Sequence, residues 1–253
     1  MFPKNDISHL VCECGKLKGL GISPRMKDYC FCSVGQVFID SKSSKLIGRG
    51  EGDYVSIFCG DFSALDGEAL NEITQKTAEE LSLLCGKYTQ KGRCAKLLVV
   101  GLGNGKIVHD ALGALVCKKL VPDENICVFP VGVASETGLD TASVVRSVAE
   151  SSRAELVIAV DSLAANSEER LGRVIQLCDS GIFAGSGVGN ENNEISLKTI
   201  GIPVISIGAP TALKPSESDK KNYLLVSGDV LGLCKKASVI ISDSIKIYFN
   251  HEI

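Results

Sequence analysis

The sequence has 253 residues, of which 45% are hydrophobic and 23% charged, with 27 Lys and Arg residues against 30 Asp and Glu residues and a formal net charge of −3. A chain this apolar can offset the entropy of ordering by burial, which excludes intrinsic disorder, and no apolar run approaches the ~20 residues of a membrane-spanning helix. The acidic balance argues against generic nucleic-acid binding, because phosphate contacts need a basic face.

The first sixty residues are predicted to contain loops and two strands. Residues 1–35 are rich in Gly and Cys without clear periodicity, which indicates loop with at most one short strand. β-branched and aromatic residues predict strands at Gln36–Ile39 and Tyr54–Cys59. Polar and glycine-rich residues predict turns between them, at Asp40–Ser44 and Gly48–Gly52.

One long amphipathic helix is predicted within Asp61–Tyr88. Its apolar face is formed by residues spaced three or four apart, namely Leu70, Ile73, Thr77, Leu81 and Leu84. Asp66 is the expected N-cap, and the acidic Glu68 in the first turn favours the helix dipole.

Strands and helices are predicted to alternate in the rest of the chain. The expected strands are Lys96–Gly101, Ile126–Val133, Glu155–Val160, Arg173–Leu177 and Pro203–Gly208, and the expected helices are His109–Leu120, Asp140–Ser152 and Asp229–Phe249. A polar surface loop is expected at Lys214–Lys221. This alternation implies crossover connections and a largely parallel sheet, hence an α/β fold.

The chain has 11 cysteines and only three histidines, His9, His109 and His251. An odd cysteine count without a secretory signal predicts reduced thiols in a cytosolic protein. The pairs Cys12/Cys14 and Cys30/Cys32 could supply four thiolates to zinc, but structural zinc ligands are usually spaced further apart, so free thiols are favoured. Small core residues are expected at Cys59, Cys85, Cys117, Cys127, Cys178 and Cys234. The scarcity of histidine favours carboxylate or thiol chemistry.

Carboxylates follow several of the predicted strands. Because ligands of open parallel sheets bind beyond the carboxyl ends of the strands, Asp110, Asp161 and Asp179 could converge on one crevice. Asp179-Ser180-Gly181 also matches the tripeptide of pepsin-type proteases, yet the helix-rich pattern does not suit an all-β protease. A turn or cap carboxylate is the favoured interpretation of Asp179.

Gly101 and Gly103 follow a buried strand, as in dinucleotide-binding loops. The full fingerprint needs a third glycine where this chain has Lys106. We therefore favour the simpler interpretation, in which the glycines permit a tight turn.

Taken together, these loops resemble the germination protease family, the spore endopeptidases of endospore-forming bacteria. The resemblance covers roughly residues 54–253, including a C-terminal helix at Leu225–Phe249. It is carried by Leu98–Asn104, Asp110–Gly113, Thr137–Thr141, Leu156–Ala165, Ile175–Ile182, Gly185–Asn190, Gly201–Gly208 and Pro210–Thr211.

The resemblance implies a three-layer α/β/α fold of the phosphorylase/hydrolase-like type, shared with hydrogenase-maturation peptidases. We expect a single domain over residues 1–253, with a divergent N-terminal segment at 1–50 and a family-like core at 51–253. The implied activity is hydrolysis of small acid-soluble spore proteins in the spore or forespore. The implied protein is cytoplasmic, a self-cleaving zymogen and a homo-oligomer, as in the tetramer of the family, and it needs no cofactor, metal, nucleic acid or membrane.

The resemblance places the two catalytic aspartates at Asp110 and Asp161. Two close carboxylates cannot both ionise cheaply, so one would keep its proton as an acid while the other acts as a base. Substrate or oxyanion binding is assigned to neighbouring loop residues, and backbone amides of the glycine-rich turn could hold an oxyanion. These residues are Asn104, Asp179, Ser186, Gly187, Gly189 and Asn190.

The chain departs from the family pattern at several positions. His109 stands where Pro is usual, Ser162 and Asn166 interrupt Asp-Ala-Leu-Ala-Ala-Arg-Ser, and Phe183-Ala184 replace His-Pro. Residues 1–50 show no match to the family's pro-segment, and a stretch before Leu225 is shorter than in longer members. Two alternatives stay open: a non-catalytic or altered-specificity paralogue that binds or regulates, and a metal-assisted maturation peptidase using carboxylates and His109.

Overall fold

The computed structural model describes Ile22 and residues 24–89, 95–165, 167–183, 194–214 and 224–250. Its strands are β1 (Arg25–Asp28), β2 (Cys32–Ile39), β3 (Gly52–Cys59), β4 (Leu97–Leu102), β5 (Ile126–Gly132), β6 (Leu156–Ala165), β7 (Val174–Cys178), β8 (Ile182–Phe183), β9 (Glu194–Ile195), β10 (Val204–Leu213) and β11 (Leu225–Val226). Its α-helices are α3 (Ser41–Ile47), α4 (Gly67–Gly86), α5 (Leu112–Cys117), α6 (Ala134–Thr137), α7 (Thr141–Ser152), α8 (Leu197–Ile200) and α9 (Val230–Asn250). Short 3₁₀ turns are η2 (Phe62–Ala64), η4 (Val108–Asp110) and η5 (Glu168–Arg170).

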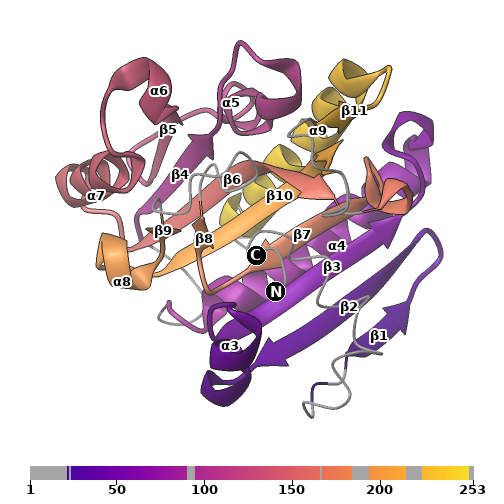
Figure 1. The fold of residues 1–253 in the computed structure, drawn as a ribbon, viewed down its shortest axis with the longest axis horizontal. Coiled ribbons are helices and arrows are strands. Elements are labelled where there is room, and N and C mark those ends of the chain that lie inside the picture. The colour runs from indigo at the N-terminus through magenta and orange to yellow at the C-terminus, as the bar shows by residue number, and fades with distance from the viewer. Residues whose placement is uncertain are drawn as a thin grey trace.

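The main sheet contains nine of the described strands and is mixed (Figure 1). Its order is β1-β2-β3-β7-β10-β6-β4-β5, with β11 paired to β10. Strands β10, β6, β4 and β5 are parallel to one another, whereas β1, β2, β3 and β7 pair antiparallel and β10 also pairs antiparallel with β7 and β11. The α/β class is therefore confirmed, but the largely parallel sheet that we expected is found in only half of it.

The connection between β6 and β7 explains the change of direction. β6 ends at Ala165 and β7 begins at Val174, with only the short turn η5 among the described residues between them. A parallel crossover needs a dozen or more residues, usually with a helix. β7 therefore runs antiparallel, between β3 and β10.

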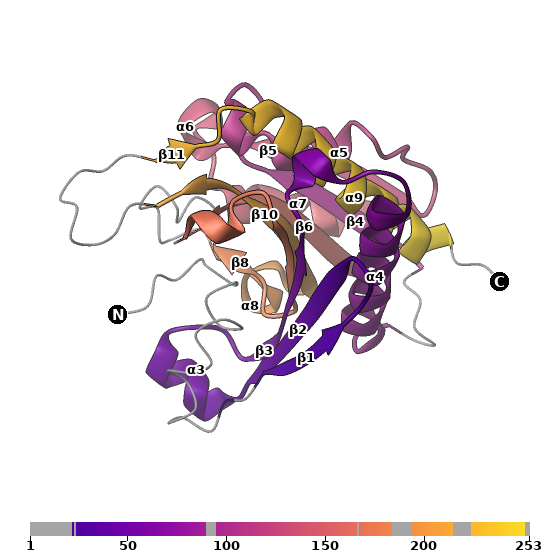
Figure 2. The ribbon, with the colours of Figure 1, turned by 90° about the vertical axis from the view of Figure 1, so that its right-hand side faces the viewer.

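Helices cover both faces of the sheet, which confirms the three-layer arrangement. Leu97 and Val99 of β4 pack on the side of α4, α5 and α9, whereas Leu98 and Val100 pack on the side of α7 and α8. Successive side chains of a strand point to opposite faces, so a continuous apolar run fits a strand covered on both sides. Figure 2 shows α4 and α9 on one side of the sheet and α3 and α8 on the other. No helix among the described residues is long and apolar enough to span a bilayer.

Several predicted elements are found within a few residues of their expected bounds, including β3, β4, β5, α7 and α9. The predicted face of α4 is buried at Ile73, Thr77, Leu81 and Leu84. Asp66 occupies its N-cap position without a side-chain capping hydrogen bond.

Other elements differ from the expectation. The predicted turn at Asp40–Ser44 begins helix α3, because Asp40 Oδ1 accepts a hydrogen bond from the Ser43 N–H at 2.7 Å. The helix predicted at His109–Leu120 is divided into η4 and the short α5. Residues 32–35 already belong to β2. Most of the predicted loop at Lys214–Lys221 lies outside the described residues.

The cysteines of the described region are all free thiols. The predicted core positions Cys85, Cys117, Cys178 and Cys234 are buried, whereas Cys59 and Cys127 are half-buried. Cys12 and Cys14 lie outside the described residues. In the region that the structure describes, no three His, Cys, Asp or Glu residues are grouped as metal ligands.

Candidate active site

Asp161 lies in β6, directly after the last residue of β6 that pairs with β4. The last residue pair between β4 and β6 is Gly101–Val160, while Asp161 still pairs with Gly208 of β10. A Cβ atom on Gly208 would collide with the Asp161 carbonyl oxygen, so glycine permits this close pairing. The Asp161 residue is only 8% exposed. The sequence suggested that the strand ends at Val160, but β6 continues to Ala165.

Asp110 is held by the turn that follows β4. Gly103 has a φ of +84°, and a Cβ atom there would collide with the Asp110 carbonyl oxygen and lie 2.6 Å from its Oδ1. The Asn104 N–H donates to Asp110 Oδ2 at 2.6 Å, and Asn104 Oδ1 accepts from the Lys106 N–H at 2.9 Å. The glycine-rich loop is therefore a tight turn around a carboxylate, as the simpler interpretation predicted. The side chain of Asn104 holds the turn itself.

Helix α5 joins Asp110 to the strand that carries Asp161. A Cβ atom on Gly113 would lie 2.5 Å from the Leu102 nitrogen and 2.7 Å from the Val160 oxygen, so only glycine lets the helix approach β4 and β6 this closely. The Leu112 N–H donates to Ser162 Oγ at 3.3 Å. Sequence reasoning missed this contact, although the glycine of the Asp-Ala-Leu-Gly motif was a signal of close packing.

Two further hydrogen bonds fix the Asp110 turn from the other side. Thr211 Oγ1, at the irregularity in β10, donates to the His109 carbonyl oxygen at 2.5 Å. Cys234 Sγ of α9 donates to the Val108 carbonyl oxygen at 3.3 Å. The turn is thus anchored through its main chain to β10 and α9.

The two carboxyl groups are electrostatically coupled. Burial, and then the negative charge of Asp110, raises the pKa of Asp161 to about 8, although the Ser162 N–H donates to its Oδ1 at 2.8 Å and opposes the shift. Burial also raises the pKa of Asp110, against the Asn104 N–H and the charge of His109. No hydrogen bond joins the two carboxyl groups within the described region. Near neutral pH the pair therefore favours a proton on Asp161.

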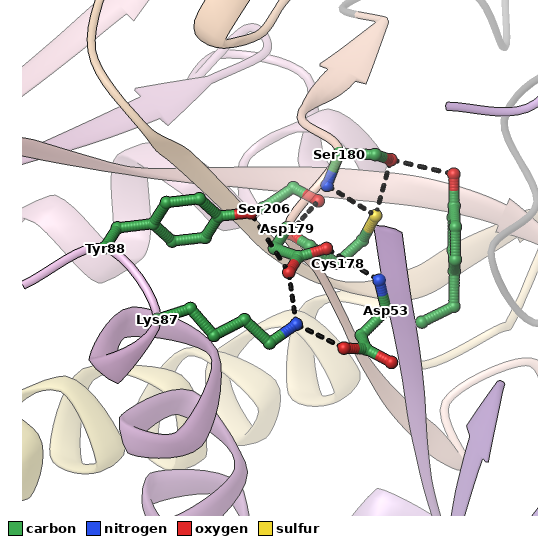
Figure 3. Close-up of polar contacts among 8 residues, drawn as sticks. Asp53, Lys87, Tyr88, Cys178, Asp179, Ser180 and Ser206 are labelled. Atoms are coloured by element: carbon green, nitrogen blue, oxygen red, sulfur yellow. Dashed lines mark hydrogen bonds and ion pairs between the residues drawn. The ribbon is translucent and has the colours of Figure 1, made fainter. Parts of the chain in front are cut away.

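Asp179 belongs to a different cluster (Figure 3). Its Oδ1 accepts from the Asp53 N–H at 2.7 Å, and its Oδ2 contacts Lys87 Nζ at 2.5 Å and the Tyr88 hydroxyl at 3.3 Å. Lys87 also forms an ion pair with the Asp53 carboxylate. The Asp179 side chain is only 2% exposed, and its contacts join the end of α4 to β3 and β7.

Strand direction separates Asp179 from the aspartate pair. In β10, Gly208 pairs with Asp161 on one side and with Gln176 of β7 on the other. Asp179 directly follows the last residue of β7, three positions after Gln176, which is about 10 Å at ~3.3 Å per residue toward the opposite end of the parallel strands. The structure thus brings Asp110 and Asp161 together and leaves Asp179 apart. This geometry agrees with the turn interpretation and does not support a substrate-binding role for Asp179.

The other candidate residues of the glycine-rich turn, Ser186, Gly187, Gly189 and Asn190, lie outside the described residues, as do Asn166 and Ala184. Phe183 pairs with Glu194 in the β8–β9 hairpin.

Comparison with known proteins assigns the family. The germination protease profile matches residues 13–227. The chain belongs to the germination protease family. It is 36% identical over 230 residues to the germination protease of Oceanobacillus iheyensis, covering 83% of this chain and 61% of that protein. It is 32% identical over 222 residues to that of Bacillus subtilis, covering 81% and 60%, and 33% identical over 190 residues to that of Clostridium acetobutylicum, covering 69% and 58%.

The chain spans about 60% of the length of these germination proteases. The family match begins at residue 13, so it includes most of the N-terminal segment that we expected to be divergent. β1 and β2, which lie in this segment, extend the central sheet.

Among solved structures, a NiFe hydrogenase maturation protease from Thermococcus kodakarensis KOD1 aligns with a TM-score of 0.40 and 20% identity. The alignment covers 60% of this chain and 94% of that one. A similarity this low carries no conclusion about activity or metal use.

Proposed function

We propose that this chain is an endopeptidase in which Asp110 and Asp161 form the acid and base pair. The observation that carries the proposal is the coupling of the buried Asp161 carboxyl group, whose pKa is about 8, to the half-buried carboxyl group of Asp110. Perturbed carboxyl pairs of this kind are typical of catalytic sites. Membership of the germination protease family supports the same reaction.

The proposed reaction assigns one role to each carboxyl group. Asp110, the more readily ionised partner, accepts a proton from a water molecule, and the resulting hydroxide oxygen bonds to the scissile carbonyl carbon. Asp161, in its neutral form, donates its proton to the carbonyl oxygen. When the C–N bond breaks, the proton taken up by Asp110 passes to the leaving amine. Asp110 is then ionised again, and Asp161 regains its proton from the hydroxyl group that it protonated as the carbonyl group re-forms.

The departures from the family pattern are compatible with this chemistry. His109 supplies a carbonyl oxygen to Thr211, a contact that its side chain does not make. Ser162 adds a hydroxyl that accepts from the Leu112 N–H. Both contacts support the loop that carries Asp110. These observations favour an active peptidase over a non-catalytic paralogue.

The natural substrates that we propose are small acid-soluble spore proteins, and the proposed site of action is the spore or forespore. Both come from the family, as do self-cleavage of a zymogen and assembly into a tetramer. These proposals are separable from the chemistry, because the aspartate pair acts on the peptide bond and not on the side chains of one substrate.

Incubation of the purified chain with a small acid-soluble spore protein tests the proposal, with products identified by mass spectrometry. Asp110→Asn and Asp161→Asn are each expected to lower kcat/KM by about a thousandfold or more. The matched control is Asp243→Asn, which changes a half-exposed aspartate on α9 that pairs with Lys246. Cleavage that survives both active-site replacements, or no cleavage by the folded wild-type chain, would overturn the proposal.

The cleavage rate after treatment with a chelator distinguishes the two-aspartate mechanism from the metal-assisted alternative. The proposed mechanism predicts an unchanged rate after dialysis against EDTA. A rate that is lost on dialysis and restored by nickel or zinc would favour the metal-assisted peptidase instead.

A further inference from the structure

Strand β6 continues for several residues beyond the end of its pairing with β4. Its ladder with β4 ends at Gly101–Val160, because Leu102 of β4 pairs with Gly132 of β5 and the chain then turns at Gly103. β6 itself continues to Ala165, paired with β10 on the other side. In the part of the chain that the structure describes, no strand pairs with the β4-side edge of residues 161–165.

The backbone groups on that edge follow from the alternation of a β-strand. The Val157 N–H donates to the Pro203 oxygen at 2.9 Å, and the Ala165 oxygen accepts from the Lys214 N–H at 2.8 Å. Odd-numbered residues of β6 therefore direct their N–H and C=O groups toward β10. The same groups of Ser162 and Ala164 point to the open edge, since alternate residues bond to opposite sides.

Most of the backbone groups on this edge are not paired with a described strand. The Ser162 N–H donates to Asp161 Oδ1. By this alternation the Ser162 carbonyl and both backbone groups of Ala164 face away from β10, toward the edge where no described strand pairs with them. Both residues have small side chains and are half-buried, so this part of β6 is partly accessible to solvent.

We propose that the edge formed by Ser162 and Ala164 binds the main chain of the substrate as an added β-strand beside Asp161. An extended peptide satisfies an open strand edge through the same hydrogen bonds that join neighbouring strands, about 4.8 Å away. This inference rests on the proposed function, because it places the scissile bond beside the aspartate pair. It explains how the site would recognise an internal stretch of chain without needing a terminus.

A substrate that binds as an added β-strand makes main-chain hydrogen bonds that repeat every two residues. Every second amide of the substrate faces the enzyme, and the amides between them face away. Replacing one facing N–H by N–CH₃ removes a hydrogen bond and inserts a methyl group into the interface. The effect of such replacements should therefore alternate along the substrate, whereas recognition through side chains has no such alternation.

The first experiment uses peptides of about ten residues that span a cleavage site of a small acid-soluble spore protein, each methylated at one backbone nitrogen. Binding is measured by calorimetry to the Asp110→Asn/Asp161→Asn double variant, and cleavage is measured with the wild-type chain. We expect losses of about tenfold or more at alternate positions and little change between them. Losses without a two-residue period, or no losses, would overturn the strand proposal.

The two measurements separate this inference from the proposed function. Alternating losses in binding without any cleavage by the wild-type chain would support the strand edge and contradict the endopeptidase. Cleavage of the parent peptide, together with binding losses that do not alternate along the sequence, would support the endopeptidase and contradict the strand edge.

A second experiment changes the enzyme. Ala164→Pro removes the N–H that faces the open edge and leaves the pairing with β10, and proline is tolerated where a strand N–H is unpaired. Ala164→Val keeps the N–H and is the matched control. We expect Ala164→Pro to weaken peptide binding about tenfold relative to Ala164→Val, with similar thermal unfolding of both variants. Equal binding by the two folded variants would contradict the proposal, and if Ala164→Pro does not fold, the methylated peptides decide.

Discussion

Asp110 and Asp161 lie on segments 51 positions apart in the chain, yet the charge of one affects the proton of the other. Burial and the Asp110 charge together raise the pKa of Asp161 to about 8. The Asn104 N–H and the charge of His109 counteract the rise at Asp110. The two carboxyl groups thus differ in their surroundings in a way that suits an acid and a base.

The rate of cleavage should follow the protonation of this pair. The proposed mechanism requires Asp161 to be neutral and Asp110 to be ionised, so kcat/KM is expected to fall as the pH rises above about 8 and Asp161 loses its proton. It should fall again in acid, at a pH above the usual aspartate range, because burial raises the pKa of Asp110. A pH profile of kcat/KM checks both limbs. A rate that remains level well above pH 8 would contradict the role of Asp161 as the acid.

The same pKa makes a prediction about stability. Because the pKa of Asp161 in the folded state is raised to about 8, the folded chain binds this proton more tightly than the unfolded chain does. The free energy of unfolding therefore decreases as the pH rises from the usual aspartate range toward 8, and it levels off above that. Asp161→Asn removes the buried charge and is expected to raise the free energy of unfolding by on the order of a few kcal/mol above pH 8, with little difference near pH 4.

Denaturant unfolding of wild type and variant at several pH values measures this difference. Asp243→Asn, at a half-exposed position, should show no comparable pH-dependent gain. An Asp161→Asn variant that is no more stable than wild type at high pH would mean that Asp161 is not held as a buried carboxyl group.

The turn at Gly103 should be sensitive to a single methyl group. Its φ of +84° disfavours any L side chain, and a Cβ atom would lie 2.6 Å from Asp110 Oδ1. Gly103→Ala is therefore expected to cost about 1–3 kcal/mol of stability and to reduce kcat/KM by displacing Asp110. Gly60→Ala is the control, since a Cβ atom there meets no atom within 4 Å. If the two alanine variants have the same activity, the turn does not position Asp110.

Periodicity and apolar runs were sufficient to predict the central elements of the fold. The spacing of Ile73, Leu81 and Leu84 predicted α4, and the apolar run within Lys96–Gly101 predicted β4, which the structure covers on both faces. The extent of β6 could not be predicted in this way. Asp161 and Ser162 interrupt its apolar run, and the strand continues because β10 pairs with it there.

The candidate site was predictable only in part, for a related reason. Asp110 follows the parallel strand β4, and Asp161 lies in β6 just past its last pair with β4, so the expectation of a shared edge applies to them. Asp179 follows β7, whose direction depends on the short link from β6 and not on its own residues. The length of that link was the available signal. The contact between Ser162 and the Leu112 N–H depends on the packing of α5, which no local pattern reveals.

Replacing Asp179 is expected to lower the stability of the protein without changing its activity. Asp179→Ala leaves Lys87 without one of its two carboxylates and the Asp53 N–H without its acceptor. Because the Asp179 side chain is only 2% exposed, the loss of these bonds is expected to cost about 2–4 kcal/mol. The activity of the protein that remains folded should be unchanged.

Urea unfolding and kcat/KM at a temperature well below the transition measure the two effects on the same samples. Asp53→Asn is the matched control, since the Asp53 side chain is 33% exposed and its ion pair with Lys87 is expected to contribute less than about 1 kcal/mol. An Asp179→Ala variant that is fully folded but as inactive as Asp110→Asn would restore the substrate-binding role suggested by the sequence. Loss of stability with activity retained would instead place Asp179 among the residues that hold α4 to β3 and β7.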